Sequence, residues 1–139
     1  MPRRDLYHFA VRNALEKDGW LVTDDPFWLK VGKKRLAVDL GAERVIAAQR
    51  GLDKIVVEIK SFTGVSDIDD LEKALGQYTL YQRILEAQSI NRRLYLALPQ
   101  AAYLGLFTIE IGQILLDSQS LQLLIFDPDS EVILQWIPC

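Results

Sequence analysis

The stretch from Lys54 to Phe62 constrains the fold most, because it has the composition of a buried β-strand and yet carries two internal charges. Its apolar residues are mainly β-branched, and such residues favour the extended backbone. Glu58 and Lys60 are two residues apart, so in a strand both side chains leave the same face. Buried charges are costly unless they are paired or bind a metal. The stretch therefore indicates either a functional site or a solvated face.

Two interpretations of this strand are open. The structural one is an amphipathic strand with a solvated Glu58–Lys60 face, since such alternation is ordinary in half-exposed strands. The functional one adds Asp39, the single carboxylate in a short apolar run upstream. Asp39 followed by Glu58-x-Lys60 resembles the PD-(D/E)xK nuclease signature, although Val38 stands where the usual proline would be. The resemblance implies a metal-dependent phosphodiesterase site.

Length and composition fit one globular domain. The chain has 139 residues, 50% hydrophobic and 25% charged, and we expect residues 1–139 to form a single domain with a sizeable core. The net charge of −3 excludes a protein that coats nucleic acid through bulk positive charge. An acidic nuclease domain is compatible with this charge, but it needs a local basic patch or a partner that supplies one.

Cysteine use and hydropathy predict a cytoplasmic protein. The single cysteine, Cys139, allows no disulfide within the chain, which fits a reducing compartment. No uninterrupted apolar segment follows Arg3 and Arg4 to form a signal peptide. No run approaches the roughly 20 apolar residues of a membrane helix.

The N-terminal pattern predicts a helix over residues 4–18 that ends at Gly19, then a short strand over residues 20–23 and a turn at residues 24–26. His8, the only histidine, lies at the edge of the apolar stripe of this helix. The pattern favours a partly buried helix residue. The alternative is a polar group turned toward the active site.

A basic run follows, with Gly32 in its middle as the tip of a hairpin. Its cations are Lys30, Lys33, Lys34 and Arg35. Such a run is usually a solvated loop. In a DNA-binding domain it is one of the few places in this chain where phosphates could be held. Beyond it, residues 36–61 are expected to form a small antiparallel meander, with strands at 36–40, 45–49 and 54–61 and a turn at 50–53.

A long helix is predicted from Asp67 to Gln88, opened by Ser66 and Asp69 in the manner of a capping box. Its expected core face is Ile68, Leu71, Leu75, Tyr78 and Leu85. Its first turns hold the acidic residues Asp67, Asp69, Asp70 and Glu72. These suit the helix dipole, so we interpret them as structural rather than metal-binding.

Gln77 and Tyr81 are four residues apart on this helix. A glutamine and a tyrosine at this spacing, after the Glu-x-Lys strand, resemble a motif of RecB-like nucleases, in which the glutamine helps to orient the site. The alternative is a solvent-facing glutamine and a core tyrosine.

The next strand, residues 92–98, is reached through the long helix, which is the arrangement of a parallel crossover. The order helix, three strands, helix, strand indicates an α/β fold with a mixed central sheet, as in the restriction-endonuclease-like core. Residues 100–119 look helical with a break at Thr108 and Ile109, and residues 121–126 and 131–137 form a hairpin.

Several short motifs, spread over almost the whole chain, resemble the fdxN-element excision controlling factor family, XisH. They are His8…Ala14-Leu15…Asp18-Gly19-Trp20, Thr23-Asp24-Asp25-Pro26, Val38-Asp39-Leu40-Gly41-Ala42-Glu43, Glu58-Ile59-Lys60-Ser61-Phe62, Gly76-Gln77-Tyr78 and Gln135-Trp136-Ile137. The resemblance implies a cyanobacterial protein of programmed DNA excision during heterocyst development. It also implies DNA, an XisI-like protein and a site-specific recombinase as partners. A homo-oligomer is compatible with the sequence.

The nuclease resemblance implies a set of site residues. Asp39, Glu58 and the backbone carbonyl of Ile59 would hold Mg²⁺ (or Mn²⁺), hard cations that prefer oxygen ligands. Lys60 would position the attacking water or stabilise the phosphate, and Gln77 would orient Lys60 or that water.

His8 stands roughly where related nucleases often place an acidic residue on the first helix, and Tyr81 would be an accessory residue. A non-catalytic recombination accessory that keeps the nuclease fold and binds a protein or DNA is the alternative function.

Overall fold

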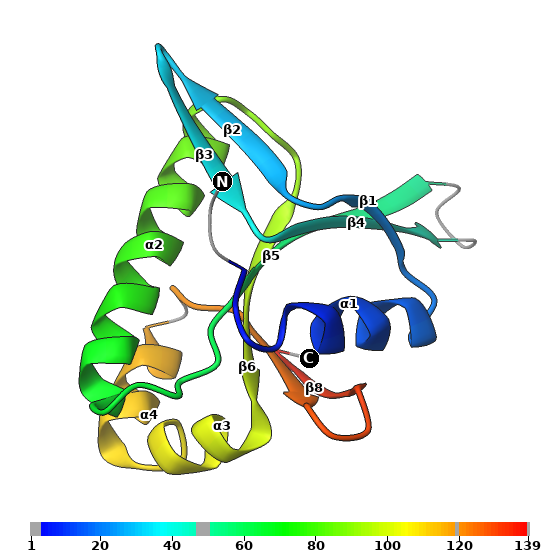
Figure 1. Cartoon of the computed structure of the whole chain (residues 1–139). Coiled ribbons are helices and arrows are strands. Elements are labelled where there is room, and N and C mark those ends of the chain that lie inside the picture. Colours follow the sequence, from blue (N-terminus) through cyan, green and yellow to red (C-terminus); the bar gives the residue numbers. More distant parts are fainter. Residues whose placement is uncertain (1–3, 47–50, 119, 139) are drawn as a thin grey trace.

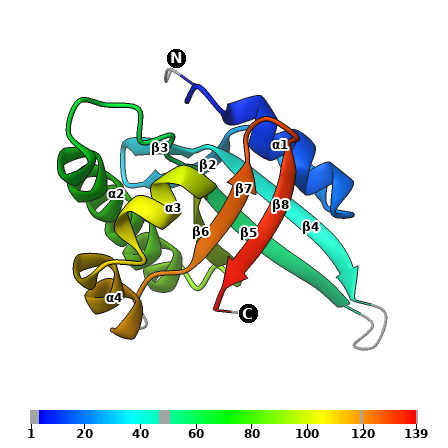
Figure 2. The same cartoon turned by 90° about the horizontal axis from the view of Figure 1, so that it is seen from below.

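The computed structural model describes residues 4–46, 51–118 and 120–138. A central sheet is covered by α1 on one face and by α2, α3 and α4 on the other (Figures 1 and 2). The elements are α1 (His8–Lys17), β1 (Leu21–Asp24), β2 (Phe27–Val31), β3 (Lys34–Val38), β4 (Leu40–Ile46), β5 (Gly51–Ile59), α2 (Asp67–Ala87), β6 (Arg93–Pro99), α3 (Gln100–Leu106), α4 (Glu110–Asp117), β7 (Leu123–Asp127) and β8 (Val132–Ile137).

The main sheet has the strand order β1–β4–β5–β6–β7–β8, and β2 pairs with β3 in a separate hairpin. Strands β5, β6 and β7 are parallel to one another, whereas the β1–β4, β4–β5 and β7–β8 pairs are antiparallel. Helix α2 makes the crossover from β5 to β6, which is why these two strands run in the same direction. The predicted α/β class, mixed sheet and parallel crossover are confirmed.

Strand β5 lies in the middle of the molecule and is buried from Ile55 to Ile59. Val56 packs toward the cluster under α2, while Ile55, Val57 and Ile59 pack toward the cluster under α1. A strand buried on both faces reads as a nearly continuous apolar run. The apolar composition of this stretch therefore has its cause in the two helical layers, and the solvated-face interpretation is wrong for Glu58, which is 7% exposed.

The first helix begins later than predicted, at His8 rather than near residue 4. The Asp5 carboxylate accepts a hydrogen bond from the Tyr7 backbone amide at 2.9 Å, and the Asp5 carbonyl accepts one from the His8 amide. These contacts hold residues 5–7 in a turn before the first helical residue. The predicted end of the helix, before Gly19, is confirmed.

The predicted meander over residues 36–61 is wrong in two places. Residues 36–38 belong to β3, which pairs with β2 outside the main sheet, and a bend at Asp39 separates them from β4. Gly51 to Asp53 are the first residues of β5 instead of a turn. Residues 47–50, part of the predicted strand and turn, lie outside the described residues.

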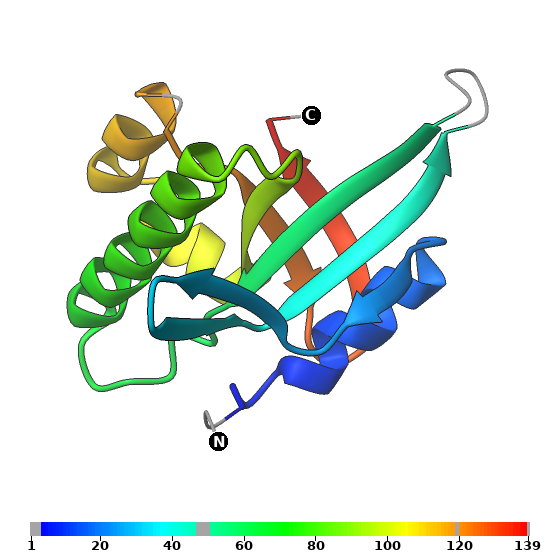
Figure 3. The same ribbon diagram turned by 90° about the horizontal axis from the view of Figure 1, so that it is seen from above.

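The basic hairpin is confirmed, with Gly32 at its tip in the left-handed region at φ +59°. Its inner residues Leu29 and Val38 are fully buried in the cluster under α2. Figure 3 shows this hairpin beside α2, lying over one end of β5.

Helix α2 agrees closely with its prediction, and Ser66 accepts a hydrogen bond from the Asp69 amide at 3.2 Å. Of the predicted core face, Leu71, Tyr78 and Leu85 are buried, but Ile68 is 39% exposed. In the C-terminal part, the break at Thr108 and Ile109 between α3 and α4 and the β7–β8 hairpin are also confirmed.

No helix in the described part of the chain is long and apolar enough to cross a membrane.

Candidate metal and nucleic-acid site

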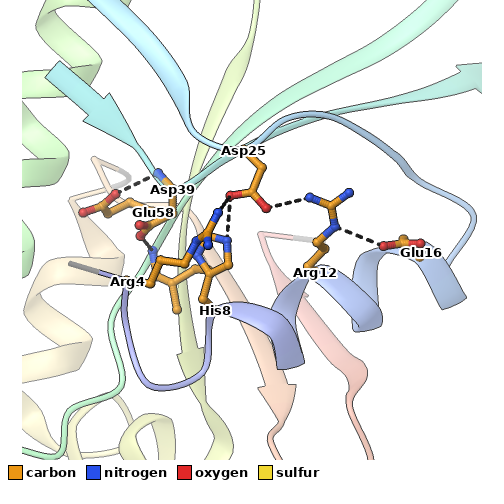
Figure 4. Close-up of polar contacts among 8 residues, drawn as sticks. Arg4, His8, Arg12, Glu16, Asp25, Asp39 and Glu58 are labelled. Carbon is orange, nitrogen blue, oxygen red and sulfur yellow. Dashed lines mark hydrogen bonds and ion pairs between the residues drawn. The ribbon is translucent and has the colours of Figure 1, made fainter. Parts of the chain in front are cut away.

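Asp39 and Glu58 meet where the β3–β4 bend faces the end of β5 (Figure 4). The backbone amide of Ile59 donates to Asp39 Oδ2 at 2.7 Å, and the Asp39 amide donates to Glu58 Oε1 at 3.3 Å. Each acidic residue is thus held by the backbone of the other segment. The bend that the strand prediction missed is what turns the Asp39 carboxylate toward β5.

The two carboxyl groups influence each other strongly. The pKa of Glu58 is raised to about 9, mainly by burial and then by the charge of Asp39 and a hydrogen bond to it. Burial also raises the pKa of Asp39, although the Ile59 amide partly opposes this. At neutral pH the pair therefore holds a proton, because two like charges at this distance in a buried site are unfavourable.

A third oxygen faces the same place. In an extended strand, the N–H and C=O of one residue point to the same edge. The Ile59 amide points to Asp39, so its carbonyl also faces the Asp39 side of β5. The predicted ligands Asp39, Glu58 and the Ile59 carbonyl are thus brought together.

This donor set fits Mg²⁺ or Mn²⁺. All three donors are oxygens, and Mg²⁺ commonly binds one or two carboxylates while it keeps several waters. Among residues 4–46, 51–118 and 120–138, no cluster of three or more His, Cys, Asp or Glu side chains is arranged to hold a metal. The site therefore suits a cation that needs few protein ligands, and not one that requires a closed cage of side chains.

Lys60 follows β5 by one residue and lies on the same side of the sheet as Glu58, as their spacing predicts. Its ammonium group is 4.0 Å from Asp70 Oδ1 at the start of α2. Asp70 is 9% exposed and also accepts a hydrogen bond from the Gly64 amide at 2.9 Å. The structural interpretation of this helical carboxylate thus agrees with its contacts. The Lys60 side chain is 25% exposed and can reach a ligand from this position.

The two candidate site residues on α2, Tyr81 and Gln77, differ in burial and in their relation to the acidic pair. Tyr81 is 7% exposed, and burial together with the charges of Glu58 and Asp39 raises its pKa to about 12. Its hydroxyl therefore lies near the acidic pair. Gln77 is exposed, and within the described residues no hydrogen bond joins it to Asp39, Glu58 or Lys60. Its orienting role stays a prediction.

Asp5 is a residue that the sequence analysis missed. Its Oδ2 accepts a hydrogen bond from the Ser61 amide at 3.0 Å, which fixes the start of the chain against the segment after β5. Its negative charge contributes to the raised pKa values of Asp39 and Glu58. An aspartate just before a helix is a local signal for a cap, but nothing local shows that its second oxygen reaches residue 61.

A second acidic centre lies beside the first. Asp25 is contacted by His8 Nε2 at 2.7 Å, by Arg12 at 2.6 Å and by Arg4 at 3.4 Å (Figure 4). Burial of Asp25 opposes its ionisation, but the Arg12 and His8 contacts outweigh burial and the pKa of Asp25 lies below its ordinary value. Sequence analysis placed Asp25 in a turn and in a family motif, but did not predict its contacts with the first helix.

His8 is 2% exposed, more buried than predicted. Its Nε2 contacts Asp25, and its Nδ1 has no hydrogen-bond partner within the part of the chain that the structure describes. His8 is also close enough to Asp39 for its positive form to lower the pKa of that carboxyl. Both interpretations of His8 therefore hold in part, since it is a buried helix residue that faces the acidic centres.

Glu58 is buried at 7% exposure, whereas Asp39 is half-buried. Described cavities of about 440, 490 and 590 Å³ are lined by other residues and include neither Asp39 nor Glu58. The predicted phosphate contacts Lys30, Lys33, Lys34 and Arg35 lie on the β2–β3 hairpin, whose second strand leads directly into Asp39.

The fold and this site define a class: a mixed α/β protein with a buried carboxylate pair suited to a divalent cation and a basic hairpin next to it. The family model described as XisH protein matches residues 1–134, and the chain belongs to the XisH family. The family resemblance seen in the sequence is thereby confirmed.

Two crystal structures are similar over nearly the whole chain. One is of an XisH family protein from Nostoc punctiforme PCC 73102, and the other is of an fdxN element excision controlling factor protein from Anabaena variabilis. Each is 38% identical, with a TM-score of 0.84, and the match covers 96% of this chain and 99% of the other chain. No curated protein matches the chain.

Proposed function

We propose that this protein acts in the programmed excision of a DNA element and that it is a metal-dependent DNA endonuclease. The first part rests on family membership and on the similarity to an fdxN element excision controlling factor protein. The second part rests on one observation, the hydrogen bonds that bring Asp39 and Glu58 together at the end of a buried strand.

The order of the elements supports a restriction-endonuclease-like core. In the main sheet, three strands lie between α1 and the crossover helix: β1, β4 and β5. The acidic residues lie at the β3–β4 bend and at the end of β5, and Lys60 is two positions after Glu58. This is the placement that the PD-(D/E)xK resemblance implies.

The residues of this chain divide the work of phosphodiester hydrolysis. Asp39, Glu58 and the Ile59 carbonyl would hold Mg²⁺ or Mn²⁺. The chemistry that such an ion supplies is polarisation of the phosphate, a lowered pKa of a bound water and neutralisation of developing charge. Lys60 would leave its distant contact with Asp70 and place its ammonium group against the phosphate oxygens. Tyr81, which is buried and whose pKa is raised by burial and by the charges of Glu58 and Asp39, would limit access of bulk water.

In the cell, the proposed partners are DNA, an XisI-like protein and a site-specific recombinase. The net charge of −3 fits a protein whose contact with DNA is local or is shared with a partner.

A second candidate function is that of a non-catalytic accessory with a nuclease-like fold. The observation in its favour is the burial of Glu58, which is 7% exposed and has a pKa of about 9. A pair that keeps its proton in the presence of Mg²⁺ would be a structural feature of a scaffold.

The deciding experiment measures Mg²⁺ binding by calorimetry and Mg²⁺-dependent nicking of supercoiled DNA, with the partner proteins present in the nicking assay. We expect wild type to bind Mg²⁺ more tightly as the pH rises from 7 to 9, because binding displaces the shared proton. Asp39→Asn and Glu58→Gln should abolish both signals. Glu72→Gln, on the exposed side of α2, is the matched control and should change neither.

Normal excision in cells by Glu58→Gln, together with no Mg²⁺ binding by wild type, would overturn the nuclease proposal and leave the accessory in its place.

A further inference from the structure

The β2–β3 hairpin has two unlike faces. Phe27, Leu29 and Val38 pack into the cluster under α2, where Leu29 and Val38 are fully buried. The alternate residues Trp28, Lys30 and Arg35 point outward, and Trp28 is 41% exposed. The hairpin is therefore anchored by one face and presents the other.

The outer face and the tip of the hairpin carry positive charge. From Phe27 to Val38 the chain has four cations and no acidic residue. Within the described ranges, none of these four cations has an acidic group within 4.0 Å. Lys30 and Arg35 are directly opposite each other in the strand register. Like charges at such a position are destabilising, so the arrangement favours an anionic ligand.

The Arg35 side chain is held in position before any ligand binds. Its guanidinium lies 4.2 Å from the centre of the Trp28 ring. The α2 end also holds the hairpin, because the Gln88 side chain donates to the Lys30 carbonyl at 2.6 Å. Stacking on an aromatic ring restricts an arginine fork without neutralising it. The same contact covers the indole face, which disfavours stacking of Trp28 on an unpaired base.

We propose that the β2–β3 hairpin enters the major groove of duplex DNA as a two-stranded ribbon, with Arg35 on a guanine edge and Lys33 and Lys34 on phosphates. The major groove of B-DNA admits a two-stranded β-ribbon, and bidentate arginine to guanine O6 and N7 is its commonest specific contact. The deep, narrow major groove of double-stranded RNA does not admit side chains in this way. The inference rests on the proposed function only in that DNA is the ligand.

Strand β3 connects Arg35, the residue proposed to contact guanine, to the acidic pair. Arg35 and Asp39 are four residues apart, which is at most about 13 Å at the rise of a strand, because the chain bends at Asp39. With a base-pair rise of about 3.4 Å, this corresponds to roughly four base pairs. Cleavage by the acidic pair would therefore fall at a fixed short distance from the guanine that Arg35 contacts.

The test uses Asp39→Asn protein, so that bound DNA is not cut. A pool of random duplexes is selected by binding and sequenced, and fluorescence anisotropy then compares an enriched duplex with a scrambled one of equal length. We expect a guanine-containing motif. Arg35→Lys in the same background should reduce the preference for the enriched duplex by roughly 5- to 150-fold. Arg83→Lys, an exposed arginine on α2, is the matched control and should leave the preference unchanged.

The lysines at the tip should behave differently. Lys33→Gln with Lys34→Gln should weaken binding to both duplexes equally and reduce the slope of log K against log salt by about 2. Trp28→Phe keeps a ring under Arg35 and should retain most of the preference, whereas Trp28→Leu should lose it.

Three results would overturn the inference: a pool with no enriched motif, an unchanged preference in Arg35→Lys, or equal binding to double-stranded RNA of the same sequence. Binding to acidic vesicles or an acidic peptide without DNA binding would also overturn it. The experiment gives a different result if the proposed nuclease function is wrong but the hairpin inference is right. In that case the motif and its Arg35 dependence persist, but wild type does not cut the enriched duplex with Mg²⁺.

Discussion

Two acidic centres lie side by side in this protein and differ in almost every electrostatic respect. Asp25 is surrounded by Arg4, His8 and Arg12, and its pKa lies below the ordinary value. Glu58 is surrounded by Asp39, a backbone amide and apolar side chains, and its pKa is about 9. Burial opposes the ionisation of both residues. At Glu58 burial is the largest cause of the raised pKa and Asp39 adds to it, whereas at Asp25 the Arg12 and His8 contacts outweigh burial.

The contrast separates a structural role from a functional one. The Asp25 centre is satisfied within the protein, since Arg4, His8 and Arg12 contact its two oxygens. It fixes α1 against the β1–β2 connection. The Asp39–Glu58 pair differs, because backbone amides are its hydrogen-bond donors and no cationic group lies within 4.0 Å of either carboxyl group among the described residues. Strongly raised pKa values with an unpaired like charge are typical of functional sites.

The largest effect that this contrast predicts concerns Lys60, the cation after the end of β5. Lys60→Ala should lower Mg²⁺-dependent nicking by about 10²- to 10³-fold, because it removes a preorganised charge at the phosphate. Stability should change by less than about 1 kcal/mol, since the Asp70 contact is 4.0 Å and partly exposed. Single-turnover nicking rates and thermal melting of the variant measure the two effects.

Glu72→Ala on the exposed side of α2 is the control for this prediction. A nicking rate within tenfold of wild type, together with a large loss of stability, would show that Lys60 is a structural partner of Asp70.

Local patterns were sufficient for much of the fold. Helix α2 has a regular apolar period and a Ser66 cap, and β5 and β6 are short apolar runs bounded by turns. Each of these signals lies within the element that it predicts. For the same reason the Glu58-x-Lys60 spacing was sufficient to predict that both side chains leave the same face of the strand.

Contacts between distant segments were not predictable in this way. Asp39 occurs in one unbroken apolar run, which hides the bend that sends the chain from the hairpin to the main sheet. Asp5 reaches Ser61 across 56 residues, and Asp25 meets Arg12 across 13. Gln77 precedes Tyr81 by four residues, about 40° beyond a full helical turn. That rotation is enough to leave Gln77 exposed while Tyr81 is buried.

The second prediction concerns Glu58 and the dependence of the stability of the metal-free protein on pH. The folded protein keeps a proton on Glu58 up to a pKa of about 9, whereas the unfolded chain loses it near the ordinary value of 4.5. Between these values the folded state binds more protons, so the metal-free protein should become less stable as the pH rises from about 5 to 9. Each unit of raised pKa corresponds to about 1.4 kcal/mol, so a loss of several kcal/mol is expected.

Glu58→Gln should flatten this pH dependence, because the amide does not ionise but can still accept the Asp39 hydrogen bond. At pH 9 the variant should melt at a higher temperature than wild type, and at pH 5 the two should be nearly equal. Urea unfolding without metal, at a series of pH values, measures this, with Glu72→Gln as control. Parallel curves for wild type and Glu58→Gln would contradict the buried, protonated state of Glu58.

The smallest effect concerns Asp25 and should have the opposite sign. Asp25→Asn removes the charge that Arg12 and His8 contact, and we expect a loss of about 1–2 kcal/mol at pH 7, or roughly 2–8 °C in melting temperature. The loss should decrease with added salt, because the Arg4 and Arg12 side chains are 51% and 34% exposed. It should also vanish in acid: the stabilisation exists above the ordinary pKa of 3.8 and disappears as the pH falls through the lower folded value. Asp117→Asn, an exposed acid on α4, is the matched control. If Asp25→Asn instead abolished Mg²⁺ binding without loss of stability, Asp25 would be part of the metal site, and the two centres would act as one.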